Sequence, residues 1–280
     1  MAEVRALLDI LFKGCVLLIA FLALVPVLHL TLAAIVNGGP VIASAGLKFF
    51  TEVPPPPGNR TYGILTSLIG TIELALLSTL VGVPISFMAA VLVVEFPHSR
   101  LGRIVRLLSR TLLELPTILI GMFVFTIIVV PLGSPSILAA SIALALVMLP
   151  YVTTYIETAL SSVPRTYREA GLALGMTKAR VAFTIVVPIA VRGVVTGILV
   201  GLAKAMGETA PLLFTLGRAR TSLNVDPLGP GDAIPLLIYD YAQAPYENLR
   251  EVAWGATLVL ITLFLLVYVL ARLTIRGVRV

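Results

Sequence analysis

A lysine and a glutamate stand one helical turn apart in a very apolar part of the sequence. They are Lys204 and Glu208, in the stretch GLAKAMGETAPLLF that runs from residue 201 to residue 214. This i,i+4 spacing lets the two side chains pair on one face of a helix. If the segment crosses a membrane, an unpaired charge there costs roughly 2.5–3.5 kcal/mol on insertion scales. We interpret the pair as functional, because ionisable groups inside membrane helices usually face a pathway or a cavity.

The residues around this pair suggest close helix packing and a hinge. Small residues recur at i,i+4 spacing as Gly193, Gly197, Gly201 and Ala205, which lets another helix approach closely. Pro211 follows Glu208 by three residues and removes a backbone donor, so it should free the carbonyl of Gly207 and kink the helix. We predict a hinge at Gly207 and Pro211. Such kinks are also common in membrane helices that serve no gate.

Another charge, Glu73, lies inside an earlier apolar segment. The same cost applies to it, so we expect a partner. The sequence leaves two readings open. Glu73 either pairs across the bundle, with Lys204 as one candidate, or is a second residue of the pathway.

The composition places these charges in an integral membrane protein. The chain has 280 residues, of which 59% are hydrophobic and only 12% charged, and its mean hydropathy is +1.06. A soluble domain carries about twice that charged fraction. The single cysteine, Cys15, excludes an internal disulfide and offers no metal cluster. We therefore predict no metal site.

The apolar segments are long enough for six spans. A helix needs about 20 apolar residues to cross roughly 30 Å of hydrocarbon. The segments run approximately over residues 14–36, 64–94, 116–132, 136–156, 193–214 and 253–270. We expect residues 1–61 to hold a first transmembrane helix and an external loop, and residues 62–280 to form a core of five transmembrane helices. With the fifth span starting after Arg192, Lys204 would lie about 18 Å along it, near the midplane.

The distribution of basic residues predicts the orientation and explains the net charge of +6 without a nucleic-acid partner. Five basic residues lie in the connections on one side: Lys48, Arg60, Arg218, Arg220 and Arg250. Fourteen lie on the other: Arg5, Lys13, Arg100, Arg103, Arg106, Arg110, Arg165, Arg168, Lys178, Arg180, Arg192, Arg272, Arg276 and Arg279. The positive side of a membrane protein is cytoplasmic, so both termini are predicted to be cytoplasmic.

Residues 161–188, between the fourth and fifth spans, form what we call the elbow. Thr166 and Glu169 have capping-box spacing and predict a helix that starts at Thr166. Gly175 can end it in the left-handed conformation. Thr177 can then cap a second helix, which should stop before Pro188. An elbow with an apolar stripe and basic flanks suits docking into a groove of a cytosolic partner. It equally suits a helix lying on the membrane surface.

The elbow also resembles the EAA motif of ABC importer permeases. The match, EAGLALGMTKARVAFTIVVP, places Glu169, Ala170, Gly171, Gly175, Ile185 and Pro188 on motif positions, with Gly171 in place of the commonest alanine. The resemblance implies a type I importer permease fold in which the elbow is a coupling helix seated in a cleft of an ATP-hydrolysing subunit. We assign Arg168, Glu169, Ala170, Gly171 and Gly175 to that coupling surface. The capping box alone would also explain Glu169.

A narrower resemblance covers the charged pair. The run AMGETAPLLFT, residues 205–215, is similar to a signature of the PstA-type permeases of phosphate-specific ABC importers. This places Lys204, Glu208 and Thr209 in the substrate pathway, with Glu73 as a further candidate. The family commonly has arginine where this chain has Lys204, so the charge is kept but bidentate recognition of phosphate is lost.

Together these features predict an all-α permease subunit of a phosphate importer in a prokaryotic cytoplasmic membrane. The sequence has no G-x-x-x-x-G-K-[ST] motif, so we expect ATP to be used by a partner subunit and this chain to be neither an enzyme nor a cofactor binder. The resemblance implies four kinds of neighbour: a homologous permease, two ATPase subunits, an extracytoplasmic phosphate-binding protein and membrane lipid. The alternatives are a permease for sulfate, molybdate or phosphonate, or a secondary transporter or channel.

Overall fold

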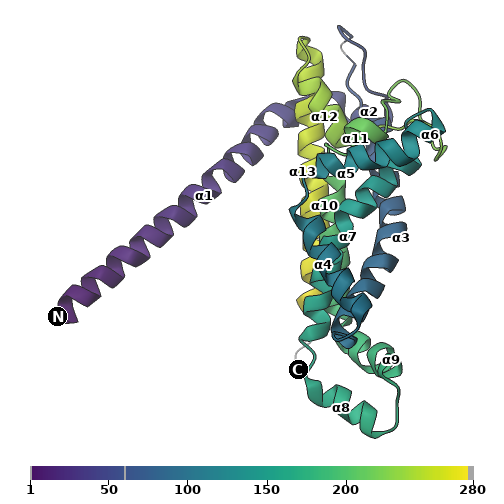
Figure 1. Cartoon of the computed structure of the whole chain (residues 1–280). Coiled ribbons are helices and arrows are strands. Elements are labelled where there is room, and N and C mark those ends of the chain that lie inside the picture. The colour runs from purple at the N-terminus through teal and green to yellow at the C-terminus, as the bar shows by residue number, and fades with distance from the viewer. Residues whose placement is uncertain (1, 60, 277–280) are drawn as a thin grey trace.

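The computed structural model describes residues 2–59 and 61–276, and within these residues all regular structure is helical (Figure 1). Arg60 and Arg279, which enter the charge count above, lie outside the described residues. The long helices are α1 (Ala2–Ala45), α3 (Leu65–Glu95), α4 (Arg100–Glu114), α7 (Ile137–Ser161), α10 (Val187–Met206) and α13 (Glu247–Arg276). The short ones are α2 (Lys48–Thr51), α5 (Thr117–Val124), α6 (Val130–Leu132), α8 (Arg165–Ala173), α9 (Lys178–Val181), α11 (Leu212–Thr215) and α12 (Ile234–Ala242).

Among the described residues, five helical runs are long and apolar enough to cross a membrane, by length and composition. They are Leu11–Ala45, Leu65–Glu95, Ile137–Ser161, Lys178–Met206 and Glu247–Leu273. The predicted third span differs, because α4 and the run Thr117–Leu132 meet at an angle of 108°. The number six holds if this bent pair counts as one broken span. The bend falls at Leu115–Pro116, where the proline disfavours the helical conformation of the residue before it.

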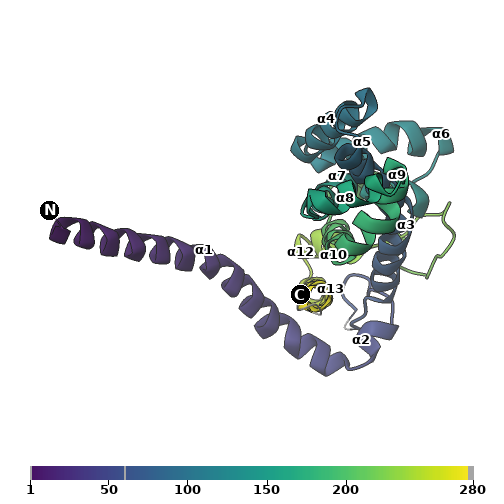
Figure 2. The same ribbon diagram turned by 90° about the horizontal axis from the view of Figure 1, so that it is seen from below.

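The bundle consists mainly of α3, α7, α10 and α13, with α7 the most buried of the spans. Its core is apolar, with large fully buried side chains such as Leu144, Met148 and Ile156 on α7. In contrast, α1 projects away from the bundle and meets it only near its C-terminal end, where it packs against α13 (Figures 1 and 2). The most apolar part of α1 has no cover within the described chain.

The predicted stripe of small residues on α10 is confirmed as a packing surface. A Cβ atom on Gly193 would come within 2.4 Å of the Ala159 side chain, and one on Gly201 within 2.1 Å of Val152. Gly197 faces the Cβ of Tyr155 in the same way, at 2.8 Å. All three neighbours lie on α7, so these glycines set how closely α7 and α10 approach.

Two prolines lie just after π-helical turns. The turn η1 (Phe125–Val129) precedes Pro131 in α6, and the turn η2 (Ala182–Val186) precedes Pro188 in α10. The prediction that the second elbow helix stops before Pro188 is therefore wrong, because α9, η2 and α10 form one continuous run. A π-turn absorbs one extra residue and relieves the clash that a proline makes with the preceding turn.

The contact between α1 and α13 yields a test with neighbouring glycines. A Cβ atom at Gly38 would lie 2.5 Å from the backbone oxygen of Trp254, whereas one at Gly39 would meet nothing within 4 Å. We expect Gly38→Ala to destabilise the docking of α1 by about 1–3 kcal/mol, because backbone cannot move aside. Gly39→Ala should be neutral or slightly stabilising. Thermal unfolding in detergent checks this, and equal melting temperatures for the two variants would refute the close approach.

Candidate functional site

The helix that carries Lys204 ends before the proline instead of kinking at it. α10 stops at Met206, and Gly207 follows with its N–H donating to the carbonyl of Lys204 at 3.3 Å. Pro211 precedes the short helix α11, so the expected kinked helix through residues 193–214 is wrong. The run also begins at Lys178, well before Arg192. Lys204 therefore lies in the last helical turn and not near the middle of its span.

The predicted ion pair is present at this break. Lys204 Nζ lies 2.5 Å from Glu208 Oε1, and the ammonium also lies 5.6 Å from the centre of the Tyr151 ring on α7. The two side chains differ in exposure: 36% for Lys204 and 9% for Glu208. The buried carboxylate thus neutralises the lysine from within, and the lysine stays partly exposed.

The residues after the pair are held by neighbouring backbone. The carbonyl of Thr209 accepts from the N–H groups of Leu212 and Leu213, at 3.1 and 3.2 Å, and starts α11. Gly121 of α5 lies so close to Pro211 that a Cβ would come within 2.6 Å of the proline Cα. The segment from Gly207 to Pro211 is therefore packed against α5, the helix that follows the bend, and is not a free loop.

Glu73 does not join this site. Lys204 pairs with Glu208, and no ion pair within the described residues includes Glu73. The expected Glu73–Lys204 pair is absent from the described structure.

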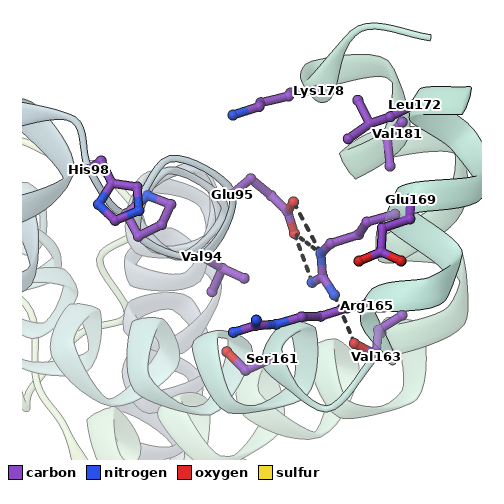
Figure 3. Close-up of a pocket in the computed structure, with 12 residues that line it drawn as sticks. Val94, Glu95, His98, Ser161, Val163, Arg165, Glu169, Leu172, Lys178 and Val181 are labelled. Carbon is purple, nitrogen blue, oxygen red and sulfur yellow. Dashed lines mark hydrogen bonds and ion pairs between the residues drawn. The ribbon is translucent and has the colours of Figure 1, made fainter. Parts of the chain in front are cut away.

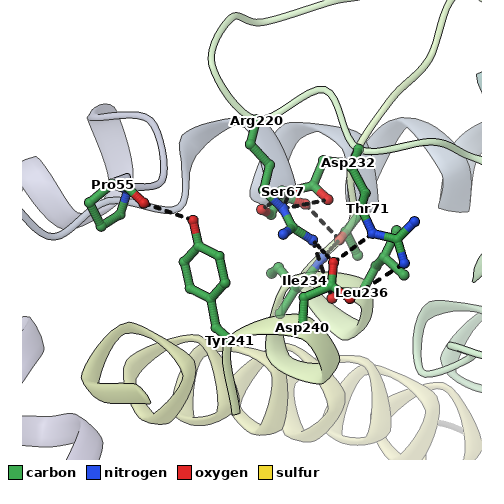
Figure 4. A network of polar contacts seen from close by, with 10 residues as sticks. Pro55, Ser67, Thr71, Arg220, Asp232, Ile234, Leu236, Asp240 and Tyr241 are labelled. Carbon is green, nitrogen blue, oxygen red and sulfur yellow. Dashed lines mark hydrogen bonds and ion pairs between the residues drawn. The ribbon is translucent and has the colours of Figure 1, made fainter. Parts of the chain in front are cut away.

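A second polar cluster fixes the 216–233 loop to the bundle (Figure 4). Arg220 donates from Nε to Asp232 at 3.2 Å and from Nη2 to Asp240 at 2.7 Å. Asp232 is completely buried and also accepts from the Ser67 hydroxyl on α3. Beside it, Thr71 Oγ1 accepts from the N–H of Ile234 at 2.8 Å.

Sequence reasoning counted Arg220 only as a charge. The sequence shows several arginines and aspartates between the last two spans. The residues next to them do not indicate which of these charges are buried.

The two aspartates of this cluster respond differently to the same arginine. Burial raises the pKa of Asp232, and the contacts with Arg220 and Ser67 offset only part of that effect. Burial also acts on Asp240, but hydrogen bonds from Arg218 and Arg220 outweigh it, so the pKa of Asp240 falls below its ordinary value. Among the contacts of the buried Asp232, Arg220 is the one that lowers its pKa most.

The elbow differs from its predicted form at its start. α8 begins at Arg165 after Pro164, and no side chain caps it, so the capping box of Thr166 and Glu169 is not formed. Pro164 takes the N-cap position itself, with φ −56° and ψ 142°, and its side chain has no acceptor for the first N–H groups of the helix. The later predictions are confirmed: Gly175 has φ +79°, and the Thr177 hydroxyl accepts from the N–H of Arg180 at 3.3 Å.

Arg168 ties the elbow to the bundle instead of pointing outward. Its partner Glu95 is labelled in Figure 3, beside the elbow residues Arg165 and Glu169. The guanidinium of Arg168 binds both oxygens of Glu95 at the end of α3, with 2.9 Å for the shortest contact. It also donates to the carbonyls of Leu160 and Val163 at 2.8 and 2.7 Å. Glu95 is 8% exposed and was missed by sequence reasoning, because it ends an apolar span far away in the chain.

The other predicted elbow residues divide into packing and surface positions. Gly171 is buried, and a Cβ there would come within 2.8 Å of Val181 and 2.9 Å of Ile185. Glu169 and Ala170 are exposed, as are the apolar side chains Tyr167 and Leu174. Beside them, a cavity of about 510 Å³ opens between the elbow and the end of α3. The elbow thus shows an apolar and charged surface that the described chain does not cover.

Comparison with known proteins agrees with these features. The family described as binding-protein-dependent transport system inner membrane component matches residues 82–280. The inward-facing MetNI methionine ABC transporter has a similar fold, with a TM-score of 0.59 over 76% of this chain and 94% of that one, at 20% identity. The chain therefore belongs to this family of multi-pass inner-membrane components and has the fold of a type I ABC importer permease.

Within the family, the relatives with high identity are phosphate permeases. The probable phosphate transport system permease protein PstA of Methanocaldococcus jannaschii is 41% identical over 98% of this chain and 95% of its own length. The phosphate transport system permease protein PstA of Pasteurella multocida is 39% identical over 83% of this chain and 82% of its own.

The Arg168–Glu95 pair predicts a large effect on the elbow. Arg168→Ala leaves a buried carboxylate unpaired, which costs about 3–5 kcal/mol. Arg168→Lys should recover only part of this, because lysine cannot make the fork and reach both carbonyls. We expect faster amide hydrogen exchange throughout α8 in both variants. The control Arg165→Ala, at an exposed position of α8, should leave exchange unchanged.

The Arg220 cluster predicts a pH-dependent defect. In Arg220→Gln, burial alone acts on Asp232, so its folded pKa lies further above its unfolded value near 3.9. A raised carboxyl pKa lowers stability as pH rises between the two values, so the deficit should be about 3–5 kcal/mol at pH 7 and shrink towards pH 4.5. Arg218→Gln, at a more exposed pair, should lose less than about 1 kcal/mol with little pH dependence in this range. A deficit of Arg220→Gln that stays constant with pH would contradict this account.

Proposed function

We propose that this chain is the permease subunit of an ATP-driven phosphate importer and forms part of the phosphate pathway. The carrying observation is the Lys204–Glu208 pair at the end of α10, with the cation open and the anion buried. The PstA relatives, at 41% and 39% identity, support phosphate as the substrate.

Lys204 supplies the counter-charge that a phosphate ion needs in a low-dielectric passage. Glu208 limits the residence time of the phosphate ion, because its negative charge offsets part of the attraction of Lys204 and repels the phosphate. The carboxylate can also accept a hydrogen bond from protonated phosphate, which sulfate cannot donate at neutral pH. Thr209 and the break at Gly207–Pro211 border the same passage. Phosphate crosses chemically unchanged, so the chain acts as a transport subunit and not as an enzyme.

The elbow is the coupling element. Tyr167, Glu169 and Leu174 form the exposed surface that would enter a cleft of an ATPase subunit. Arg168 acts as a positioning residue, because its bonds to Glu95 and to two carbonyls fix α8 to the end of α3. A movement of the ATPase would thus be passed directly to a membrane helix.

The remaining partners follow from uncovered surfaces and from the relatives. α1 shows an apolar helix that lipid and a homologous permease would cover, which supports a heterodimer. Two ATPase subunits would bind the elbows of the two permeases, and ATP would be their ligand. An extracytoplasmic phosphate-binding protein would dock near the 216–233 loop. In this orientation both termini are cytoplasmic, as the basic residues predict.

The first test is labelled phosphate uptake by proteoliposomes that contain the chain with its co-purifying subunits. ATP is supplied on the cytoplasmic side, and excess sulfate on the opposite side. Uptake that requires ATP and resists sulfate supports the proposal. Uptake without ATP would indicate a secondary transporter or channel, and competition by sulfate would indicate another oxyanion permease.

Substitutions of the pair test the pathway itself. We expect Lys204→Gln to reduce phosphate uptake at least about tenfold, since an anion loses its counter-charge in a site of low dielectric. Lys204→Arg should keep most of the activity, because it keeps the charge. Glu208→Gln should alter the rate and weaken discrimination against sulfate. Unchanged uptake and selectivity in Glu208→Gln would refute the role of the carboxylate.

A further inference from the structure

The unpaired carboxylate of Glu73 lies on an uncovered face of α3. Its Oε2 atom is buried and has no hydrogen-bond partner in the described structure. Around it is a cavity of about 320 Å³ lined by Ile69, Ile72, Leu76, Leu77 and Val225, all of them apolar. Leu76 and Leu80, one and two turns further along the same face, are 66% and 71% exposed. A single anion thus sits in an apolar surface that the described chain does not cover.

Such an arrangement is unfavourable if lipid covers this face. Charged side chains in membrane helices pair with one another or line water-filled cavities, and a lone one is expensive. Within the described residues no ion pair includes Glu73, and Lys204 is already neutralised by Glu208. The described residues thus supply no counter-charge to Glu73, which leaves this role to a neighbouring subunit. The cavity has room for a long side chain, and its apolar walls suit the methylene stem of a lysine or arginine.

We infer that the face of α3 formed by Ile69, Glu73, Leu76 and Leu80 is an interface with the second permease subunit, which inserts a lysine or arginine beside Glu73. The occupant is a protein helix, because the face is apolar along two turns and needs one cation at a fixed height. A carboxylate at this place also selects the partner. In a homodimer, the surface that meets Glu73 would have to carry a cation of this same chain. A related permease subunit can carry a lysine or arginine at that position instead.

This inference rests on the proposed heterodimer, and carbodiimide labelling tests it. Dicyclohexylcarbodiimide is apolar and modifies protonated carboxyl groups in membranes. In the complex with co-purified subunits, we expect Glu73 to react at least tenfold more slowly than in the full chain purified alone, as measured by mass spectrometry. Glu208 is the internal reference, because Lys204 pairs with it in both preparations. Rapid labelling of Glu73 in the complex would show a protonated, lipid-facing carboxyl and overturn the interface.

Cross-linking identifies what covers the face. A photoreactive maleimide is attached to Glu73→Cys in a Cys15→Ser background, and to Leu266→Cys on exposed α13 as a control. Position 73 should capture the second permease, at a peptide with a lysine or arginine within one helical turn, and position 266 should not. Capture of lipid alone, or of a peptide without a basic residue, overturns the inference.

A charge reversal provides the third measurement and separates the two proposals. Glu73→Lys should reduce the co-purified second permease at least tenfold, and the control Leu266→Lys less than twofold. Equal losses would show a general cost of inserting lysine and refute the ion pair. Phosphate uptake is measured on the same unmodified complex. If the complex transports phosphate but Glu73 faces lipid, only the proposed interface is refuted. If position 73 cross-links to the second permease but the complex does not transport phosphate, only the proposed substrate is refuted.

Discussion

The absence of water from the hydrocarbon layer is the constraint on which this structure depends. Every charge and every open backbone group within the layer needs a partner supplied by protein. The chain meets this need locally at the end of α10, where Lys204 and Glu208 pair with each other and the carbonyls of Lys204 and Ala205 accept from Gly207 and Glu208. At the end of α3, Glu95 meets it by capturing Arg168 from the elbow. The same requirement thus accounts for both the Lys204–Glu208 pair and the attachment of the elbow to α3.

These pairs divide the molecule into parts of different stiffness. The bonds of Arg168 connect α8 to the end of α3 and to the end of α7. The Arg220 cluster likewise connects the 216–233 loop to α12. Between the elbow and the 216–233 loop lies the break from Gly207 to Pro211. It directly follows the helical turn that carries Lys204. The segment after the break is packed against α5, whereas Lys204 itself remains 36% exposed.

Much of the architecture could be predicted, because spans are read from local hydrophobicity. The glycine stripe, the turn at Gly175, the Thr177 cap and the i,i+4 pair depend on residues close in sequence, and all are confirmed. Some predictions that failed depended on distant packing, whereas the capping box at Thr166 and the stop before Pro188 failed for local reasons. The end of α10 at Met206 and the role of Glu95 follow from contacts between separate helices. The helix continues through Pro188 because the π-turn before it relieves the clash between the proline ring and the preceding turn.

The contact between Gly38 and Trp254 has a consequence for how the molecule is made. It joins the first long helix to the last, and the described chain offers α1 little other support. During synthesis the first helix enters the membrane before the helix it packs against has been translated. Its docking site is complete only after α13 has been translated, so this long-range contact must form late. Until then α1 is surrounded by lipid, can rotate about its axis and is accessible to another subunit.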